Sequence, residues 1–170
     1  MISKEFLDQA NYYIGLNLPR VVSCINMLSE EEIWHKPNTY SNSVGNLVLH
    51  LCGNMTQYIL SGLGGKADER QREAEFSTSG GLSKEELSAK ITEVVTQVQQ
   101  VISQINETDL LKKRIVQGFE MTGVGIIIHV AEHFSYHTGQ IAFWTKLLRD
   151  TDLGFYKGIN LNAKNEICTQ

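Results

Sequence analysis

The stretch SKEELSAKITEVVTQVQQVISQI, residues 83–105, decides the fold class of this chain. It opens with Ser83 and, three residues later, Glu86, the capping-box pattern that begins many helices. Its apolar residues then recur every three or four positions: Leu87, Ile91, Val94, Val95, Val98, Val101, Ile102 and Ile105. One apolar face at a 3.6-residue period predicts an amphipathic helix that packs against other helices.

Three more segments show helical spacing of their apolar residues. The first runs from Lys4 to about Leu28, with Pro19 expected to kink or restart it. The second runs from an N-cap at Ser43 to about Leu60, and the last covers roughly residues 122–149. Outside them, Ser29 and Glu32 form a second capping-box pattern that opens a short turn before Pro37, and a short extended piece is expected at residues 115–116. The segments therefore predict an all-α four-helix bundle.

A polar linker of about twenty residues, 62–81, separates the second helix from the third. This length permits a long crossover connection between helices 2 and 3 that runs along the whole bundle. We expect residues 1–150 to form the bundle and residues 151–170 to form a C-terminal tail that packs on it.

Composition excludes several classes of protein. Fifteen Lys and Arg against nineteen Asp and Glu leave a net charge of −4, which gives no basic face for nucleic acid. No membrane span is expected, because no apolar run approaches eighteen residues. The N-terminus carries Glu5 early and has no apolar core of the signal-peptide type. The cysteines Cys24, Cys52 and Cys168 are odd in number, lie far apart and form no CxxC, which argues against a disulfide framework or a thiolate zinc site. The sequence therefore predicts a soluble, cytoplasmic protein.

The histidines are the candidates for chemistry. His129, His133 and His137 are spaced i, i+4 and i+8, so they form one stripe on the last helix, on the side of Gln140. His50 lies in the middle of the second helix among apolar neighbours. Two imidazoles at i and i+4 can bind one ion, and a third from a neighbouring helix completes a set that leaves a coordination position free.

Two interpretations of this cluster remain open from spacing alone. One is a metal site, for which Zn, Ni, Fe(II), Co and Mn all accept imidazole ligands. The other is a buried polar network without metal, satisfied by Gln140, Asn54 and water. The order His129-x-x-Glu132-His133 also matches the inverted zincin motif, but no distal acidic ligand accompanies it, so a protease is disfavoured.

Two stretches, SNSVGNLVLHLCGN at residues 41–54 and HFSYHTGQI at residues 133–141, resemble the DinB-like (YfiT-like) metalloenzyme superfamily, in an uncharacterised branch. The resemblance implies a four-helix bundle with a long connection between helices 2 and 3. It implies a divalent metal ion on His50, His133 and His137, with Zn or Ni expected first and Fe or Mn next. Members are commonly homodimers, and some are thiol-dependent transferases or isomerases that use bacillithiol, mycothiol or glutathione.

The same resemblance implies a metal-dependent transferase or hydrolase with a small-molecule substrate. Its most concrete form is an S-transferase that joins a low-molecular-weight thiol to small electrophiles. His129 is then the extra histidine, which lines the pocket, shuttles a proton or packs, and Gln140 orients a ligand or caps a helix contact. Whether the chain is catalytic stays open, because a non-catalytic, stress-related dimeric bundle that binds metal accounts for the same residues.

Overall fold

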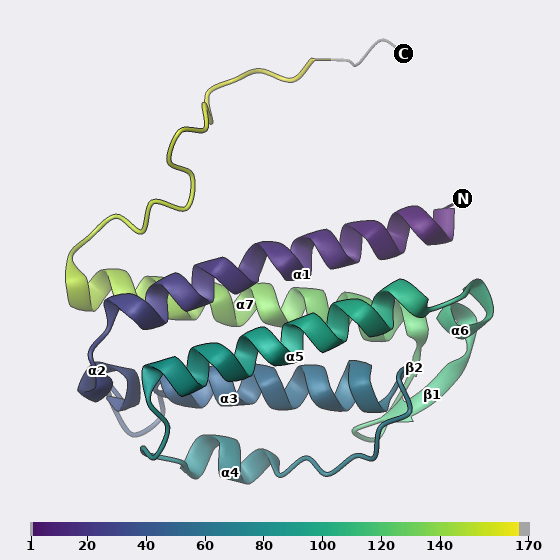
Figure 1. Ribbon diagram of the computed structural model, residues 1–170, viewed down its shortest axis with the longest axis horizontal. Coiled ribbons are helices and arrows are strands. Elements are labelled where there is room, and N and C mark those ends of the chain that lie inside the picture. The colour runs from purple at the N-terminus through teal and green to yellow at the C-terminus, as the bar shows by residue number, and fades with distance from the viewer. Residues whose placement is uncertain (1, 167–170) are drawn as a thin grey trace.

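Four long helices dominate the computed structural model, which describes residues 2–166. They are α1 (Ile2–Met27), α3 (Val44–Met55), α5 (Lys84–Gln104) and α7 (Gly123–Arg149), and a π-helical turn η1 (Thr56–Ser61) extends α3. Helix α1 packs against α5 and α7, and α3 packs against the same two helices, so the four surround one core (Figure 1). The all-α prediction is confirmed.

Serine caps place the beginnings of three helices where the sequence predicted them. Ser29 begins the short helix α2 (Glu30–Trp34), Ser43 begins α3 and Ser83 begins α5, each with a complete capping box. Pro19 lies inside α1 and does not restart the helix. The cap at Ser43 matters most for the site, because it fixes where α3 and its histidine begin.

The crossover runs beside the bundle and carries a short helix that the sequence did not predict. Helices α3 and α5 begin at the same end of the bundle, so residues 62–83 must return along its length (Figure 1). Helix α4 (Arg72–Ser77) lies on this return path and packs against α3. Glu75 is the buried residue of α4, which brings a carboxylate to the side of α3.

A two-stranded hairpin connects the third long helix to the last one. After the short helix α6 (Glu107–Leu111), strand β1 (Lys113–Val116) pairs antiparallel with β2 (Phe119–Thr122). The turn residues Gln117 and Gly118 have φ values of 52° and 83°, as a type I′ turn requires. The sequence predicted one extended piece only, because Gln-Gly lacks the Asn-Gly signal typical of this turn.

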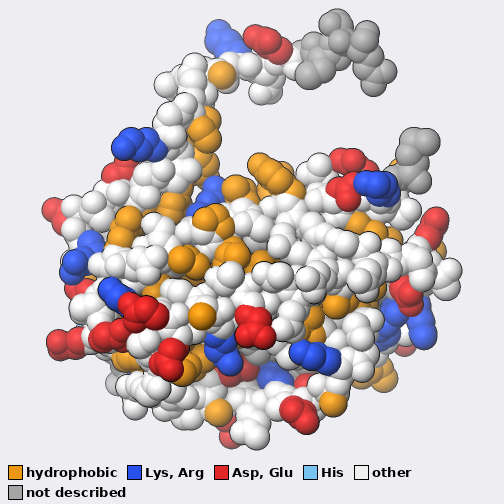
Figure 2. All heavy atoms as spheres, in the orientation of Figure 1, with side chains coloured by type: hydrophobic (Ala, Val, Ile, Leu, Met, Phe, Trp, Pro, Cys, Tyr) orange, Lys and Arg blue, Asp and Glu red, His pale blue; other side chains and the backbone are white. Residues whose placement is uncertain are grey.

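Apolar side chains remain exposed on the outer face of α1 and α7. They include Tyr13 on α1 and Ile128, Tyr136 and Phe143 on α7. Figure 2 shows hydrophobic side chains gathered over these two helices, below the point where the tail departs. None of the helices within residues 2–166 is long and apolar enough to cross a membrane.

The C-terminal tail contacts the bundle at its beginning. Leu153 is buried, and the rings of Phe155 and Tyr156 lie against the guanidinium of Arg20, at 5.5 and 5.3 Å. Residues 156–166 are exposed and lead away from the helices (Figure 1). Residues 167–170 of the expected tail, with Cys168, lie outside the described part of the chain.

Candidate metal centre

Three histidine side chains from two helices meet inside the bundle. His50 projects from α3, and His133 and His137 project from α7; their ligand nitrogens all lie within 4.8 Å of one another. The Nε2 atoms of His50 and His133 are 3.0 Å apart. His50 and His137 are buried and His133 is half-buried, so the cluster has one more accessible side.

A carboxylate on the crossover fixes the orientation of the His50 ring. Nδ1 of His50 lies 2.9 Å from Oε2 of Glu75 and 3.2 Å from Nη2 of Arg70. A guanidinium only donates, so we assign the Nδ1–H hydrogen bond to the nearer, accepting carboxylate. The proton on Nδ1 leaves Nε2 with a free lone pair that faces His133 and His137, the arrangement in which carboxylates orient metal-binding histidines.

Glu75 is itself held by a buried arginine. Arg70 donates to both carboxylate oxygens, at 2.7 and 2.9 Å, and its side chain is 3% exposed. Burial raises the pKa of Glu75, but the hydrogen bonds from Arg70 and His50 outweigh it and bring the pKa below its ordinary value. Glu75 is therefore ionised at neutral pH and is a strong acceptor for the ring of His50.

Helix α4 is held against α3 by Asn46, the partner of Ser43 in the capping box of α3. The side-chain amide of Asn46 donates to the backbone carbonyls of Glu75 and Thr78, at 2.9 and 2.6 Å. Its Oδ1 accepts from the backbone amide of Ser43 as part of the capping box. One side chain thus couples the beginning of α3 to the position of the carboxylate beside His50.

Gly53 leaves the space that Glu75 occupies, and this gives a testable expectation. A Cβ at residue 53 would lie 1.8 Å from Oε1 of Glu75, whose position Arg70 fixes. We expect Gly53→Ala to reduce the free energy of unfolding by about 1–3 kcal/mol in urea titrations, although alanine favours helix. The matched control is Gly139→Ala, where a Cβ meets nothing within 4 Å and should stabilise α7. Equal effects of the two substitutions would contradict the packing described here.

An amide on α7 orients the second ring. Nδ1 of His137 lies 2.6 Å from Oε1 of Gln140, which can only accept, so Nδ1 carries the proton. The Nε2 lone pair of His137 then faces the cluster, as that of His50 does. The structure thus places Gln140 beside His137, on the face of α7 where the sequence expected it.

His129 lies next to the cluster but outside it. Its Nε2 is 3.2 Å from Nδ2 of Asn54, and its ring lies between those of Tyr58 and His133, with centroids 4.4 and 5.3 Å away. Glu132 is exposed, and neither residue joins the three ligand atoms that meet within 4.8 Å. The geometry therefore does not support the inverted zincin motif.

Burial keeps the three histidines of α7 neutral. It lowers the pKa of His133 to about 3, with further lowering by the nearby His137 and His50. Burial also lowers the pKa of His137 and of His129 below the ordinary value. Uncharged imidazoles have lone pairs at neutral pH, which is the form that binds metal ions.

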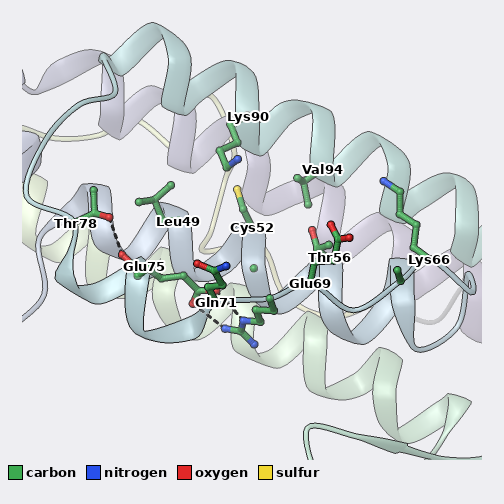
Figure 3. Close-up of a pocket in the computed structure, with 14 residues that line it drawn as sticks. Leu49, Cys52, Thr56, Lys66, Glu69, Gln71, Glu75, Thr78, Lys90 and Val94 are labelled. Atoms are coloured by element: carbon green, nitrogen blue, oxygen red, sulfur yellow. Dashed lines mark hydrogen bonds and ion pairs between the residues drawn. The ribbon is translucent and has the colours of Figure 1, made fainter.

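Two cavities flank the ion pair of Arg70 and Glu75. A cleft of about 310 Å³ reaches His50 and His133, and the other side chains that line it are Asn54, Arg70, Arg72, Gln117, Phe119 and His129. A larger cavity of about 490 Å³ lies between the crossover, α3 and α5, and none of the three histidines lines it. There Cys52 and Lys90 point toward one another (Figure 3), and burial raises the pKa of Cys52 to about 12. The smaller cleft is therefore the one that opens on the histidines.

The fold is that of DinB-like proteins, as its similarity to a solved structure shows. A DinB-like protein from Bacillus subtilis (YjoA) matches with a TM-score of 0.66 and 17% identity, over 85% of this chain and 94% of that one. A conserved protein from Enterococcus faecalis matches with a TM-score of 0.61 and 17% identity, over 88% and 96%. The chain belongs to the family described as protein of unknown function (DUF1572), whose model matches residues 2–159. No curated protein matches it.

Proposed function

We propose that the protein is a divalent-metal-dependent enzyme in which His50, His133 and His137 hold the ion. The observation that carries the proposal is which nitrogen carries the proton in two of the imidazole rings. His50 and His137 both direct their N–H outward, to Glu75 and Gln140, so their Nε2 lone pairs face a common point. Zn–N bonds of 2.0–2.1 Å in a tetrahedral site separate ligand nitrogens by about 3.3 Å, which small adjustments of these rings can reach.

Hydrogen bonding alone satisfies this cluster less well than a cation does. With both outward protons committed, the inward nitrogens of His50 and His137 are acceptors, and His133 has one Nε2 proton to offer. That proton can serve His50, 3.0 Å away, but not both rings at once. A divalent ion accepts all three lone pairs, which favours the metal over a buried polar network.

Three protein ligands leave coordination positions open, and a bound ion there lowers the pKa of a thiol or of water. We propose thiol S-transfer to small electrophiles as the reaction. A carbon–sulfur bond forms, the leaving group departs with its electron pair, and the thiol proton passes to solvent. Burial raises the pKa of both Cys24 and Cys52, so neither described cysteine offers a thiolate. The nucleophile is then a low-molecular-weight co-substrate.

A panel of small thiols and electrophiles tests this function. The tag-free protein is loaded with Zn or Ni, and the loss of free thiol is followed with and without the electrophile. We expect turnover that disappears in His137→Ala while the circular dichroism spectrum stays the same. Metal binding without turnover across the panel would contradict the enzyme and favour a non-catalytic metal-binding protein.

A further inference from the structure

The cleft that reaches the histidines is lined by cationic and neutral side chains. The charged side chains along it are Arg70 and Arg72, and no Asp or Glu is among the lining residues. Arg70 is neutralised by its ion pair with Glu75, so the local positive charge of the cleft comes from Arg72, in a chain whose net charge is −4. Low-dielectric walls strengthen such a field, and a divalent ion on the histidines would strengthen it further.

The two arginines of the cleft differ in whether their guanidinium groups already have partners. Arg70 donates to Glu75 and to Oε1 of Gln57, and its side chain is buried. Arg72 is exposed, and within residues 2–166 no ion pair joins it to a carboxylate. Its guanidinium lies 4.9 Å from the ring centroid of Phe76, which in turn is 4.7 Å from that of His50. Arg72 is therefore an uncommitted cation held at the mouth of the cleft by stacking.

The hairpin supplies the other wall. The hydroxyl of Tyr58 donates to Oε1 of Gln117 at 2.9 Å, which ties the tip of the hairpin to η1. Phe119, the first residue of β2, is 62% exposed and lines the cleft. A ligand that enters here meets an apolar ring on one side, a free guanidinium on another and the histidines at the inner end.

We infer that this cleft binds a small organic acid and that Arg72 pairs with its carboxylate. The inference rests on the proposed function and names the class of co-substrate: a thiol that also bears a carboxylate. The planar guanidinium can donate two parallel hydrogen bonds to a carboxylate. The apolar part of the molecule lies along Phe119, and the sulfur reaches the metal position. Arg72 is a specificity-determining residue in this arrangement.

A spectroscopic titration tests the inference without relying on turnover. The protein is loaded with Co(II), and the thiolate-to-cobalt charge-transfer band is followed as thiol is added. The probes are 3-mercaptopropionate and its amide, 3-mercaptopropionamide, which differ chiefly in the charge of one group. We expect the carboxylate to bind about tenfold more tightly than the amide, the effect of one charge-assisted pair.

Variants assign the preference to Arg72. Arg72→Gln should remove the preference, because the affinity for the carboxylate thiol falls while the affinity for the amide stays the same. Arg72→Lys should keep part of the preference, because the charge remains although the planar fork is lost. Arg20→Gln is the matched control, since Arg20 also lies over aromatic rings but far from this cleft, at the tail. It should leave the ratio of the two affinities as it is in the wild type.

The outcomes separate this inference from the proposed function. If no Co(II) spectrum develops, the metal site itself is wrong. If the band forms with equal affinity for both thiols, or if Arg72→Gln leaves the preference intact, the metal site stands and the role of Arg72 is overturned. Loss of the preference in Arg20→Gln as well would also overturn the role of Arg72.

Discussion

Replacing His137 with alanine is expected to abolish stoichiometric metal binding. The wild-type chain should bind one Zn or Ni ion, measured by elemental analysis of tag-free protein after removal of excess metal. The variant loses one of the three proposed ligands, so its affinity should fall by more than the 10–100-fold typical of changes beside a metal ligand. In thermal unfolding, metal at about 100 times the dissociation constant stabilises the wild type by about 2.7 kcal/mol, and this gain should vanish.

His129→Ala is the matched control for that experiment. His129 lies on the same stripe of α7, its ring stacks on His133, and its pKa is lowered by burial as that of His137 is. It lies outside the group of converging nitrogens, so the variant should keep its stoichiometric ion. Loss of metal in His129→Ala with retention in His137→Ala would show that a different set of side chains holds the ion.

Glu75→Ala is expected to produce the largest loss of stability. It leaves the guanidinium of Arg70 buried without its partner, and breaking a buried pair in this way costs about 3–5 kcal/mol. The His50 ring also loses its acceptor, which should weaken metal binding by about 10–100-fold. Urea titration of the metal-free protein measures the first effect, and calorimetric titration with metal measures the second.

Neighbouring variants separate the two effects. Glu73→Ala changes an exposed residue of the same helix and should alter stability by no more than about 0.5 kcal/mol. Glu75→Ala combined with Arg70→Met removes both charges, so it should recover much of the stability but none of the metal affinity. Full recovery of metal affinity in this double variant would refute the orienting role of Glu75.

The helical part of the site could be predicted from the sequence because helices impose a period. His133, His137 and Gln140 share one face of α7 whatever the rest of the chain does, and the cap at Ser43 sets the beginning of α3. His50, in the middle of the second helix, was a candidate third ligand, and the resemblance assigned it to the set. Its approach to His133 across 83 residues depends on packing between two helices, which spacing within one segment does not specify.

The crossover part of the site could not be predicted. Arg70 and Glu75 belong to a polar stretch rich in charged residues, and no periodicity distinguishes them from Glu69 or Glu73. Tertiary contacts select them: the space beside Gly53 and the amide of Asn46 place Glu75 against His50. A glycine inside the predicted second helix is a signal of close approach, but no sequence pattern identifies the residue that approaches it.

The crossover also bears on how such proteins can diverge in evolution. Between residues 62 and 82 the buried groups are Glu75 and the side chain of Arg70, which bind each other, so the bundle core makes few demands on this segment. Its length and sequence can drift while α3 and α7 keep their histidines, and each new crossover path would present a different partner to the ring of His50. The scaffold and the residues that adjust its chemistry are thus encoded in separate stretches of chain, free to change at different rates.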